Sequence, residues 1–332
     1  MLNFAIVGLG RWGKVLVDSV QDKSSVVRFI MAVTRDPVGA TGYCAVRGIA
    51  PIGSFADALS DPAIDGIVLA TPHSHHSRQV IDCAAARKPV FVEKPFALTS
   101  ASAAGAVAAA QKAGIVVAVG HNRRWLPPIV DLKQMVVSGD LGTILHIECN
   151  FSGNAVGRYS SDSWRVSTGE SPAGGLAGSG IHQIDAIIHL VAPITEVFAV
   201  SVARIHELPI DDTTVATFRL ADGATASLLT MTATAPIYRL QVFGTNARAQ
   251  VDGLADTRGS ETLEIITVGG ERRIINYPAL DIERAELEAF ADAVAGRNPY
   301  PISIAEILNG VAAFEAVTVS AANRSAISIS VD

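Results

Sequence analysis

The chain has 332 residues, a formal net charge of −6 and a mean hydropathy of +0.34. This length exceeds what one hydrophobic core usually organises and predicts two domains. The acidic balance argues against nucleic acid as a partner, and apolar runs such as residues 115–119 are far shorter than the roughly 18 residues that span a bilayer. Three scattered cysteines and an N-terminus without a secretory signal predict reduced thiols in a cytoplasmic protein.

In the first 120 residues, short β-branched runs alternate with helical stretches, which is typical of a parallel sheet with crossover helices. An alanine-rich helix over residues 101–113 begins after an N-cap at Thr99 or Ser100 and ends at Gly114. The expected strands of this first domain are residues 4–7, 28–33, 66–70, 90–93 and 116–119.

After residue 120 the pattern changes to consecutive strands, which predicts a largely antiparallel sheet. A helix is expected near residues 129–138, and residues 221–223 read as a turn. Two late helices over residues 283–295 and 303–320 end the chain, and we expect the second to pack back on the first domain. The expected strands are residues 144–151, 197–206, 213–220, 224–232, 238–244 and 261–268.

A glycine motif, Gly8-Leu9-Gly10-Arg11-Trp12-Gly13, follows the first expected strand and opens a helix through residues 14–20. In this context Gly8 would make a tight turn, Gly10 would let backbone amides approach a pyrophosphate, and Gly13 would allow close helix–strand packing. The alternative is a glycine-rich turn that binds nothing. We favour a dinucleotide site.

The cofactor preference is predicted from the end of the second strand, where NAD-binding domains carry a carboxylate for the ribose. Thr34 occupies that position here and Arg35 follows it. A guanidinium suits a 2′-phosphate, and the missing acid removes charge repulsion, so NADP is the first choice. NAD stays open because a shift of one or two residues would place the Asp36 carboxylate on the 2′-hydroxyl.

Three histidines, His73, His75 and His76, follow Thr71 and Pro72 at the end of the strand over residues 66–70. A metal site is disfavoured because two of them are adjacent and no cysteine or spaced carboxylate completes a ligand set. We expect the segment to line the cofactor or to cap a helix.

Lys94 ends the strand over residues 90–93 and precedes Pro95, which favours an extended backbone. Carboxyl ends of parallel strands share one edge of a sheet, so the lysine is expected on the same edge as the glycine motif. A surface ion pair is the alternative to a functional role at this position.

Five motifs, in this order, make the chain resemble the Gfo/Idh/MocA oxidoreductases over nearly its whole length. The resemblance implies an N-terminal Rossmann domain over residues 1–120, joined by the helix at 303–320, and a substrate-binding and oligomerisation domain over 121–302. It also implies NAD or NADP, and dimers or tetramers formed through a large open sheet. The motifs are Gly8-x-Gly10-x-x-Gly13, Thr71-Pro72 with His76, Glu93-Lys94-Pro95, Gly120-x-Asn122-Arg123-Arg124 and Gly180-x-His182-x-x-Asp185, and the Trp164-Arg165 pair accompanies them.

The resemblance implies Lys94 and His182 as catalytic residues. Lys94 would polarise a substrate oxygen and His182 would exchange its proton, while a hydride moves between nicotinamide and a hydroxyl carbon of a sugar or polyol. Relatives carry an acidic residue four positions before the histidine, where this chain has Gly178. If residues 181–190 are helical, Asp185 shares the face of His182 and would orient its imidazole in place of the absent acid.

The face shared by His182, Asp185 and His189 has two other interpretations. It could bind a metal ion through these three side chains, or it could belong to an amphipathic interface helix whose polar groups are hydrogen-bonded within the protein. Two other functions also stay open: a redox-assisted hydrolase or lyase that retains its nicotinamide, and a non-enzymatic dinucleotide sensor. We expect a small sugar-like or polyol-like substrate and copies of the chain as partners, with no nucleic acid, membrane or metal. The expected substrate-binding residues are Asp185, Trp164 and Arg124. The expected cofactor-binding residues are Gly8, Gly10, Arg11, Trp12, Gly13, Thr34, Arg35, Thr71, Pro72, His73, His76, Glu93, Lys94 and Arg165.

Overall fold

The computed structural model describes residues 1–205, 208–254 and 257–330, and the chain divides into two compact units. The first unit comprises Met1–Asn122 and Asp281–Ile307, and the second comprises Arg123–Leu280 and Leu308–Asp332. The chain therefore enters the first unit twice.

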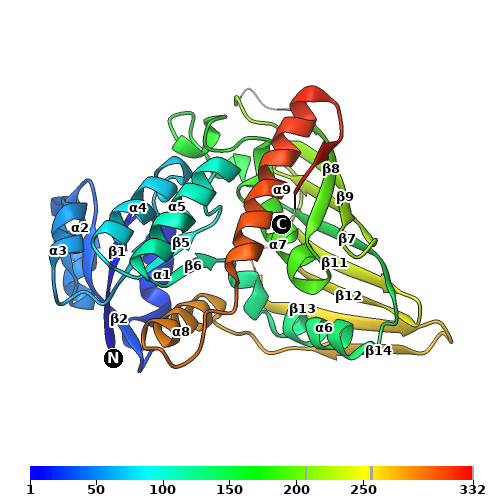
Figure 1. Cartoon of the computed structure of the whole chain (residues 1–332), viewed down its shortest axis with the longest axis horizontal. Coiled ribbons are helices and arrows are strands. Elements are labelled where there is room, and N and C mark those ends of the chain that lie inside the picture. The colour runs from blue at the N-terminus through cyan, green and yellow to red at the C-terminus, as the bar shows by residue number, and fades with distance from the viewer. Residues whose placement is uncertain (206–207, 255–256, 331–332) are drawn as a thin grey trace. The chain divides into compact units, whose positions relative to one another are not determined.

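The first unit contains a six-stranded parallel sheet in the order β3-β2-β1-β4-β5-β6. Figure 1 labels β1, β2, β5 and β6 of this sheet. The strand order reverses between β1 and β4, which is the doubly wound Rossmann arrangement that the sequence predicts. The strands are β1 (Leu2–Val7), β2 (Val27–Val33), β3 (Ala50–Ile52), β4 (Gly66–Leu69), β5 (Val90–Glu93) and β6 (Val117–Gly120). The helices are α1 (Arg11–Val20), α2 (Pro37–Arg47), α3 (Phe55–Ser60), α4 (His76–Ala85), α5 (Ser100–Ala113) and α8 (Ile282–Val294).

Strands β4, β5 and β6 are buried along their whole length because helices cover both faces of a parallel sheet. Helix α8 contributes Phe290 to this core, where its ring lies 5.1 Å from that of Phe4 and 5.9 Å from that of Phe91. The predicted ends of α5 are confirmed: the Thr99 hydroxyl accepts a hydrogen bond from the amide of Ser102, and Gly114 adopts a left-handed φ of +67°.

The second unit contains a nine-stranded sheet in the order β14-β13-β12-β11-β7-β10-β9-β8-β15. All of its pairings are antiparallel except that of β10 with β7, as the sequence predicts for most of this sheet. The strands are β7 (Ile144–Ser152), β8 (Ile194–Val202), β9 (Thr213–Leu220), β10 (Thr225–Met231), β11 (Ile237–Gly244), β12 (Ala247–Leu254), β13 (Thr257–Thr267), β14 (Arg272–Asn276) and β15 (Ile327–Ser328). The strand expected over 197–206 ends at Val202, and His206 lies outside the described residues.

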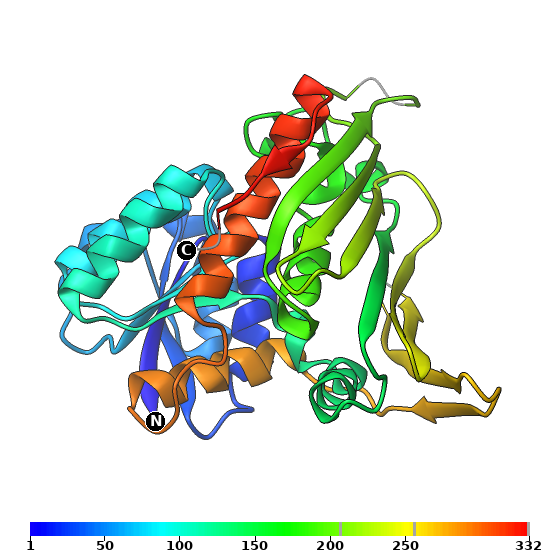
Figure 2. The same ribbon diagram turned by 45° about the vertical axis from the view of Figure 1, so that its right-hand side comes forward.

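Helices α6 (Pro127–Ser138), α7 (Gly180–Leu190) and α9 (Ile304–Asn323) accompany this sheet, and α7 packs on β7 and β10 (Figure 2). Strands β12 and β14 were not predicted. In β12 the polar residues Arg248, Gln250 and Asp252 interrupt the apolar pattern, and in β14 exposed polar residues dominate. These polar side chains occupy one face of the sheet, and Ala247, Ala249 and Val251 are buried on the other.

The helix expected at 303–320 is confirmed as a helix, and its packing on the first domain stays a prediction. This helix is α9, which belongs to the second unit from Leu308 onward. The Asn309 amide binds both the N–H and the C=O of Ile194, and the Ser320 hydroxyl accepts from the amide of Ala199, so α9 satisfies the backbone of β8. The segment that returns to the first unit is Asp281–Ile307, which carries α8.

Helix α9 is also, within the described parts of the chain, the single helix long and apolar enough to cross a membrane. Half of its most apolar window is buried inside the protein, and buried helices of globular proteins meet the same criterion. Its length and composition alone are therefore weak support for a membrane span.

Candidate functional site

The glycine motif forms a tight turn between β1 and α1 in which each glycine has a different role. Gly8 has a left-handed φ of +97°, and a Cβ atom on it would lie 2.5 Å from the carbonyl oxygen of Ala70. A Cβ on Gly13 would lie 2.0 Å from the carbonyl oxygen of Gly8, so helix and strand pack too closely for any side chain there. Gly10 faces open space and begins α1 without a side-chain cap.

The loop that follows β2 places the predicted specificity residues at the carboxyl edge of the same sheet. The Asp36 carboxylate accepts a hydrogen bond of 2.8 Å from the amide of Gly39 and so caps α2. Arg35 is exposed, and no hydrogen bond or ion pair holds its guanidinium among the described residues. Asp36 is thus engaged in local structure, whereas Arg35 is available to a ligand.

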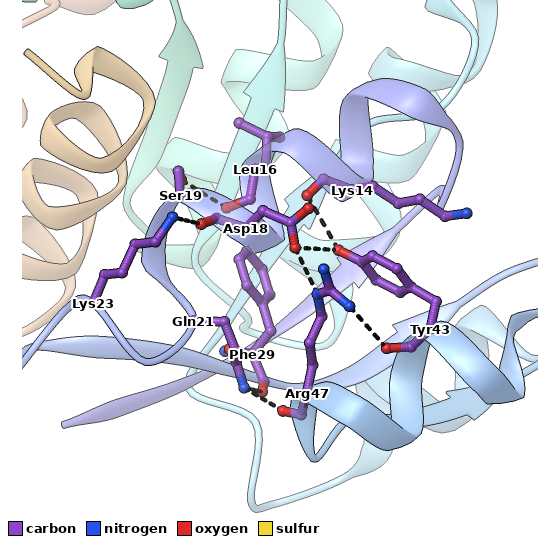
Figure 3. Close-up of polar contacts among 9 residues, drawn as sticks. All are labelled: Lys14, Leu16, Asp18, Ser19, Gln21, Lys23, Phe29, Tyr43 and Arg47. Atoms are coloured by element: carbon purple, nitrogen blue, oxygen red, sulfur yellow. Dashed lines mark hydrogen bonds and ion pairs between the residues drawn. The ribbon is translucent and has the colours of Figure 1, made fainter. Parts of the chain in front are cut away.

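A polar cluster fixes α2 against α1 and thereby holds this loop in place (Figure 3). The Asp18 carboxylate on α1 accepts from the Arg47 guanidinium at 2.5 Å and from the Tyr43 hydroxyl at 2.9 Å, both on α2. Arg47 also stacks 3.8 Å from the centre of the Tyr43 ring. Burial and the bond to Asp18 raise the pKa of Tyr43, so its hydroxyl stays protonated and donates.

The histidine segment after β4 is organised around His76, which is fully buried. Its Nδ1 lies 2.8 Å from the carbonyl oxygen of Pro95 and its Nε2 lies 3.1 Å from that of Thr71. Both ring nitrogens therefore face backbone acceptors and tie the loops after β4 and β5 together. The His73 ring packs edge-on against it, with 5.9 Å between ring centres.

No group of three or more histidine, cysteine or acidic side chains that could hold a metal ion occurs in the described portion of the chain. Both ring nitrogens of His76 in particular face backbone carbonyl oxygens within the protein.

At the end of β5, Glu93 is buried and Lys94 is half-buried. The Glu93 carboxylate accepts a hydrogen bond of 3.2 Å from the backbone amide of Lys94, and it lies near the indole N–H of Trp12, whose geometry falls short of a full hydrogen bond. Burial raises the pKa of Glu93 to about 7, although Lys94 and Trp12 act to lower it. The glycine loop, Thr71–Pro72 and Lys94 follow β1, β4 and β5, which are neighbours in the sheet.

Sequence reasoning missed two further residues at this edge, Glu283 and Glu286 of α8, and it gave no role to the amide of Asn122, which lies in one of the motifs. All three are buried, and the Asn122 side chain donates to Glu283 at 3.1 Å. The two glutamates are three residues apart on the buried face that also carries Leu287 and Phe290. That spacing of acidic residues within an apolar helix stripe was a signal in the sequence, because carboxylates are rarely buried without a reason.

In the second unit, the predicted helix carrying His182 is α7, and the imidazole is buried against an aromatic group. Its ring centre lies 5.9 Å from that of Phe151, which stacks edge-on against Tyr238 at 5.3 Å. The guanidinium of Arg123 lies 5.0 Å and 5.2 Å from the centres of these two rings. Burial raises the pKa of Tyr238, although Arg123 acts to lower it.

Asp185 lies one turn further along α7, where both of its carboxylate oxygens accept from the guanidinium of Arg124 at 2.7–3.2 Å. The same guanidinium lies 3.1 Å from Nδ1 of His189, which must act as the acceptor because arginine only donates. The side chains of Arg124 and Asp185 are 5% and 7% exposed, so this is a buried ion pair. Arg124 and Asp185, predicted to touch substrate, are thus shown to be bonded to each other.

The predicted pair Trp164 and Arg165 lies in a short helical turn, η4 (Trp164–Val166), where the guanidinium stacks 4.1 Å from the centre of the indole ring. A second tight turn precedes α7. Gly174 adopts a φ of +56°, and a Cβ on it would lie 1.9 Å from the carbonyl oxygen of Asp211. This turn holds the approach to α7 against the start of β9.

Two sequence profiles match the chain. That of an oxidoreductase family with an NAD-binding Rossmann fold matches residues 2–121, and that of the GFO/IDH/MocA C-terminal domain matches residues 129–250. The chain belongs to the GFO/IDH/MocA family. It is an NAD(P)-binding oxidoreductase, as its motifs predict.

Three proteins show how far the likeness of this GFO/IDH/MocA chain extends. The uncharacterized oxidoreductase YrbE of Bacillus subtilis is 28% identical over 273 residues, which are 79% of this chain and 76% of YrbE. Inositol 2-dehydrogenase of Mycolicibacterium smegmatis is 30% identical over 152 residues, which are 45% of this chain and only 44% of that enzyme. Levoglucosan dehydrogenase in complex with NADH has a TM-score of 0.88 at 21% identity, with 99% of each chain covered, and so shares the fold.

Gly178 is where this GFO/IDH/MocA chain departs from the motif it otherwise follows. A Cβ at Gly178 would meet only the carbonyl oxygen of Gly175, at 3.8 Å, which is ordinary van der Waals contact. Crowding at Cβ therefore does not account for the absence of an acidic side chain.

Proposed function

We propose that this protein transfers a hydride between NAD(P) and a hydroxyl-bearing carbon of a sugar, a polyol or a related small molecule. The observation that carries the proposal is the shared edge of the first sheet, where the glycine loop and Lys94 follow strands that both neighbour β4. The substrate class is supported by the names of the relatives, which include inositol 2-dehydrogenase and levoglucosan dehydrogenase.

The glycine loop fits a dinucleotide. Gly10 leaves open space, and the first turn of α1 has amides without a side-chain cap, which is how backbone N–H groups receive a pyrophosphate. Residues of the loops after β1, β2, β4 and β5 would hold the cofactor, including Trp12, Arg35 and Thr71. When bound, the nicotinamide supplies the acceptor or donor of the hydride.

The chain's own residues would then handle the oxygen and its proton. In the oxidative direction, Lys94 places a positive charge at the reacting oxygen and stabilises the charge that develops there. His182 accepts the hydroxyl proton, since an imidazole titrates near the working pH, and the roles reverse in reduction. Trp164 offers an aromatic face for a sugar ring, and the ion pair of Arg124 with Asp185 fixes the helix that carries His182.

We infer a preference for NADP, supported by an available guanidinium at Arg35 and a carboxylate at Asp36 that caps α2. Replacing Arg35 by Ala is expected to raise KM for NADP about 10- to 100-fold, the worth of a charge-assisted hydrogen bond, and to leave KM for NAD nearly unchanged. The measurement is initial rates with both cofactors across a panel of sugars, polyols and sugar acids. Arg28→Ala, an exposed arginine within β2 itself, is the control.

The same panel separates the proposal from its two rivals. Turnover without net change in the absorbance of reduced nicotinamide would indicate a hydrolase or lyase that retains its cofactor, a function that the absence of an acid at Gly178 favours as second candidate. Cofactor binding with no turnover of any substrate would indicate a sensor. An equal rise in KM for NADP and for NAD in Arg35→Ala would contradict the NADP assignment.

We place the reaction in the cytoplasm, consistent with three buried free cysteines.

We further propose that copies of the chain associate through the face of the second sheet that carries exposed apolar residues. Phe198, Val200 and Val202 of β8 and Val215 of β9 are 39–51% exposed, and Val200 pairs directly with Val215. A contiguous apolar stripe of this kind is typical of an interface.

Val200→Asp is therefore expected to convert the assembly to monomers, because a charge would be desolvated in the contact. Light scattering coupled to size exclusion measures the mass. Val46→Asp, an exposed valine of α2, is the control and should leave the mass unchanged. An assembly that survives Val200→Asp at low protein concentration would place the contact elsewhere.

A further inference from the structure

A group of buried polar atoms lies around the end of β5 and has more acceptors than donors. Both carboxylate oxygens of Glu286, one of Glu93 and the amide oxygen of Asn122 have no hydrogen-bond partner among the described residues. Glu286 is fully buried, and Glu93 and Asn122 are about 5% exposed or less. Unpaired oxygens at this depth are costly, so the protonation state of the group needs an explanation.

The charges in this group do not balance if every carboxylate is ionised. Glu93, Glu283 and Glu286 together would carry three negative charges, and Lys94 is the cation that acts on Glu286 and Glu93. Glu283 receives a hydrogen bond from Asn122, which suits an ionised group, and Glu93 receives one from the amide of Lys94, which favours its ionised form against the effect of burial. Glu286 receives none, so it is the carboxyl group that holds a proton.

We propose that Glu286 is a positioning residue that stays protonated at neutral pH and so limits the negative charge that acts on Lys94. The role toward Lys94 rests on the proposed function. The proton held by Glu286, called the stored proton below, does not. With Glu286 neutral, the lysine ammonium is left to act on a substrate oxygen. Loss of the proton adds a buried negative charge that draws the ammonium toward the cluster, and the released proton passes to solvent.

The pH dependence of stability follows from the groups that face Glu286: Glu93 and Lys94 at the end of β5, and Glu283 on its own helix. Burial and the two neighbouring carboxylates raise the pKa of Glu286 well above the ordinary value, while Lys94 acts to lower it. A carboxyl group with a raised folded-state pKa stabilises the fold below its unfolded pKa, and this stability is lost as pH rises through the folded pKa.

The stored proton is tested without any substrate. In the holoenzyme at neutral pH, infrared difference spectra between wild type and Glu286→Gln should contain the C=O stretch of a protonated carboxylic acid, which the variant loses. Melting temperature should fall from weakly acidic to alkaline pH less steeply in Glu286→Gln than in wild type. Glu288→Gln, the same change on the less buried part of α8, should match wild type in both measurements.

An unchanged carboxylic-acid band, or melting curves of Glu286→Gln and wild type that run parallel with pH, would overturn the stored proton. If Glu286→Gln fails to fold, the conservative Glu286→Asp replaces it in the infrared measurement. This variant must still show the band of a protonated carboxylic acid at neutral pH, and absence of that band would overturn the stored proton.

The positioning role has its own measurement. Glu286→Gln mimics the protonated acid at every pH, so its kcat/KM should match wild type at neutral pH. Above the pH at which Glu286 ionises, kcat/KM of wild type should fall and that of the variant should not. The ratio of the variant's kcat/KM to that of wild type should therefore rise by about tenfold per pH unit. A ratio that stays constant into the alkaline range overturns the positioning role. A failure of the proposed function is distinguished by full activity of Lys94→Met, a result that leaves the infrared difference between wild type and Glu286→Gln to be read by itself.

Discussion

Lys94→Met is expected to reduce kcat by about 10²–10⁴-fold while leaving the dissociation constant of the cofactor within a few-fold of wild type. Methionine keeps most of the length and apolar volume of lysine but removes the charge that would face the developing negative charge on the substrate oxygen. The half-buried position at the end of β5 makes loss of charge, not of packing, the main consequence.

The measurements are steady-state rates and fluorescence titration with the reduced cofactor. Lys112→Met, on an exposed position of α5, is the matched control and should be fully active. Full activity of Lys94→Met would refute the catalytic assignment, and loss of cofactor binding in parallel with kcat would instead assign the lysine to the cofactor site.

Arg124→Met is expected to lower the free energy of unfolding of the second unit by about 3–5 kcal/mol. The change leaves the Asp185 carboxylate, 7% exposed, without the guanidinium that binds both of its oxygens. It also removes the donor that faces His189 on the next turn of α7. A loss of this size is a large part of the stability of an ordinary domain.

Two of the three tryptophans, Trp125 and Trp164, belong to this unit, so urea denaturation followed by tryptophan fluorescence reports mainly on it. Arg219→Met breaks an ion pair of 3.0 Å with Glu196 in the same unit, but the two side chains are 75% and 41% exposed, so the loss should be about 1 kcal/mol or less. The double change Arg124→Met with Asp185→Leu should recover part of the stability, because it leaves no buried charge unpaired. Equal losses in Arg124→Met and Arg219→Met would contradict the buried-pair account.

The local elements of the site were predictable because short-range rules set them. Strand β5, the turn at Gly8 and the cap at Thr99 depend on residues within a few positions of one another. Helix α7 was also predicted, together with the shared face of Asp185 and His189, which follows from helical periodicity.

The partners of those residues were not predictable, because they come from distant parts of the chain. The sequence predicts Asp185 and Arg124 as separate substrate contacts, but 61 residues apart they form one buried ion pair. The return of Asp281–Ile307 to the first unit is likewise decided by where Phe290 finds a buried surface.

The sequence by itself therefore determined the class of fold, the family and the positions of the glycine loop, Lys94 and His182, since each depends on local pattern or on short motifs. Only the tertiary structure decided the charge around them. It brings Glu283 and Glu286 of α8 to the end of β5, some 190 residues away in the chain, where the burial of Glu286 without a donor favours a neutral acid. Desolvation depends on everything that surrounds a side chain, and no local sequence pattern specifies it.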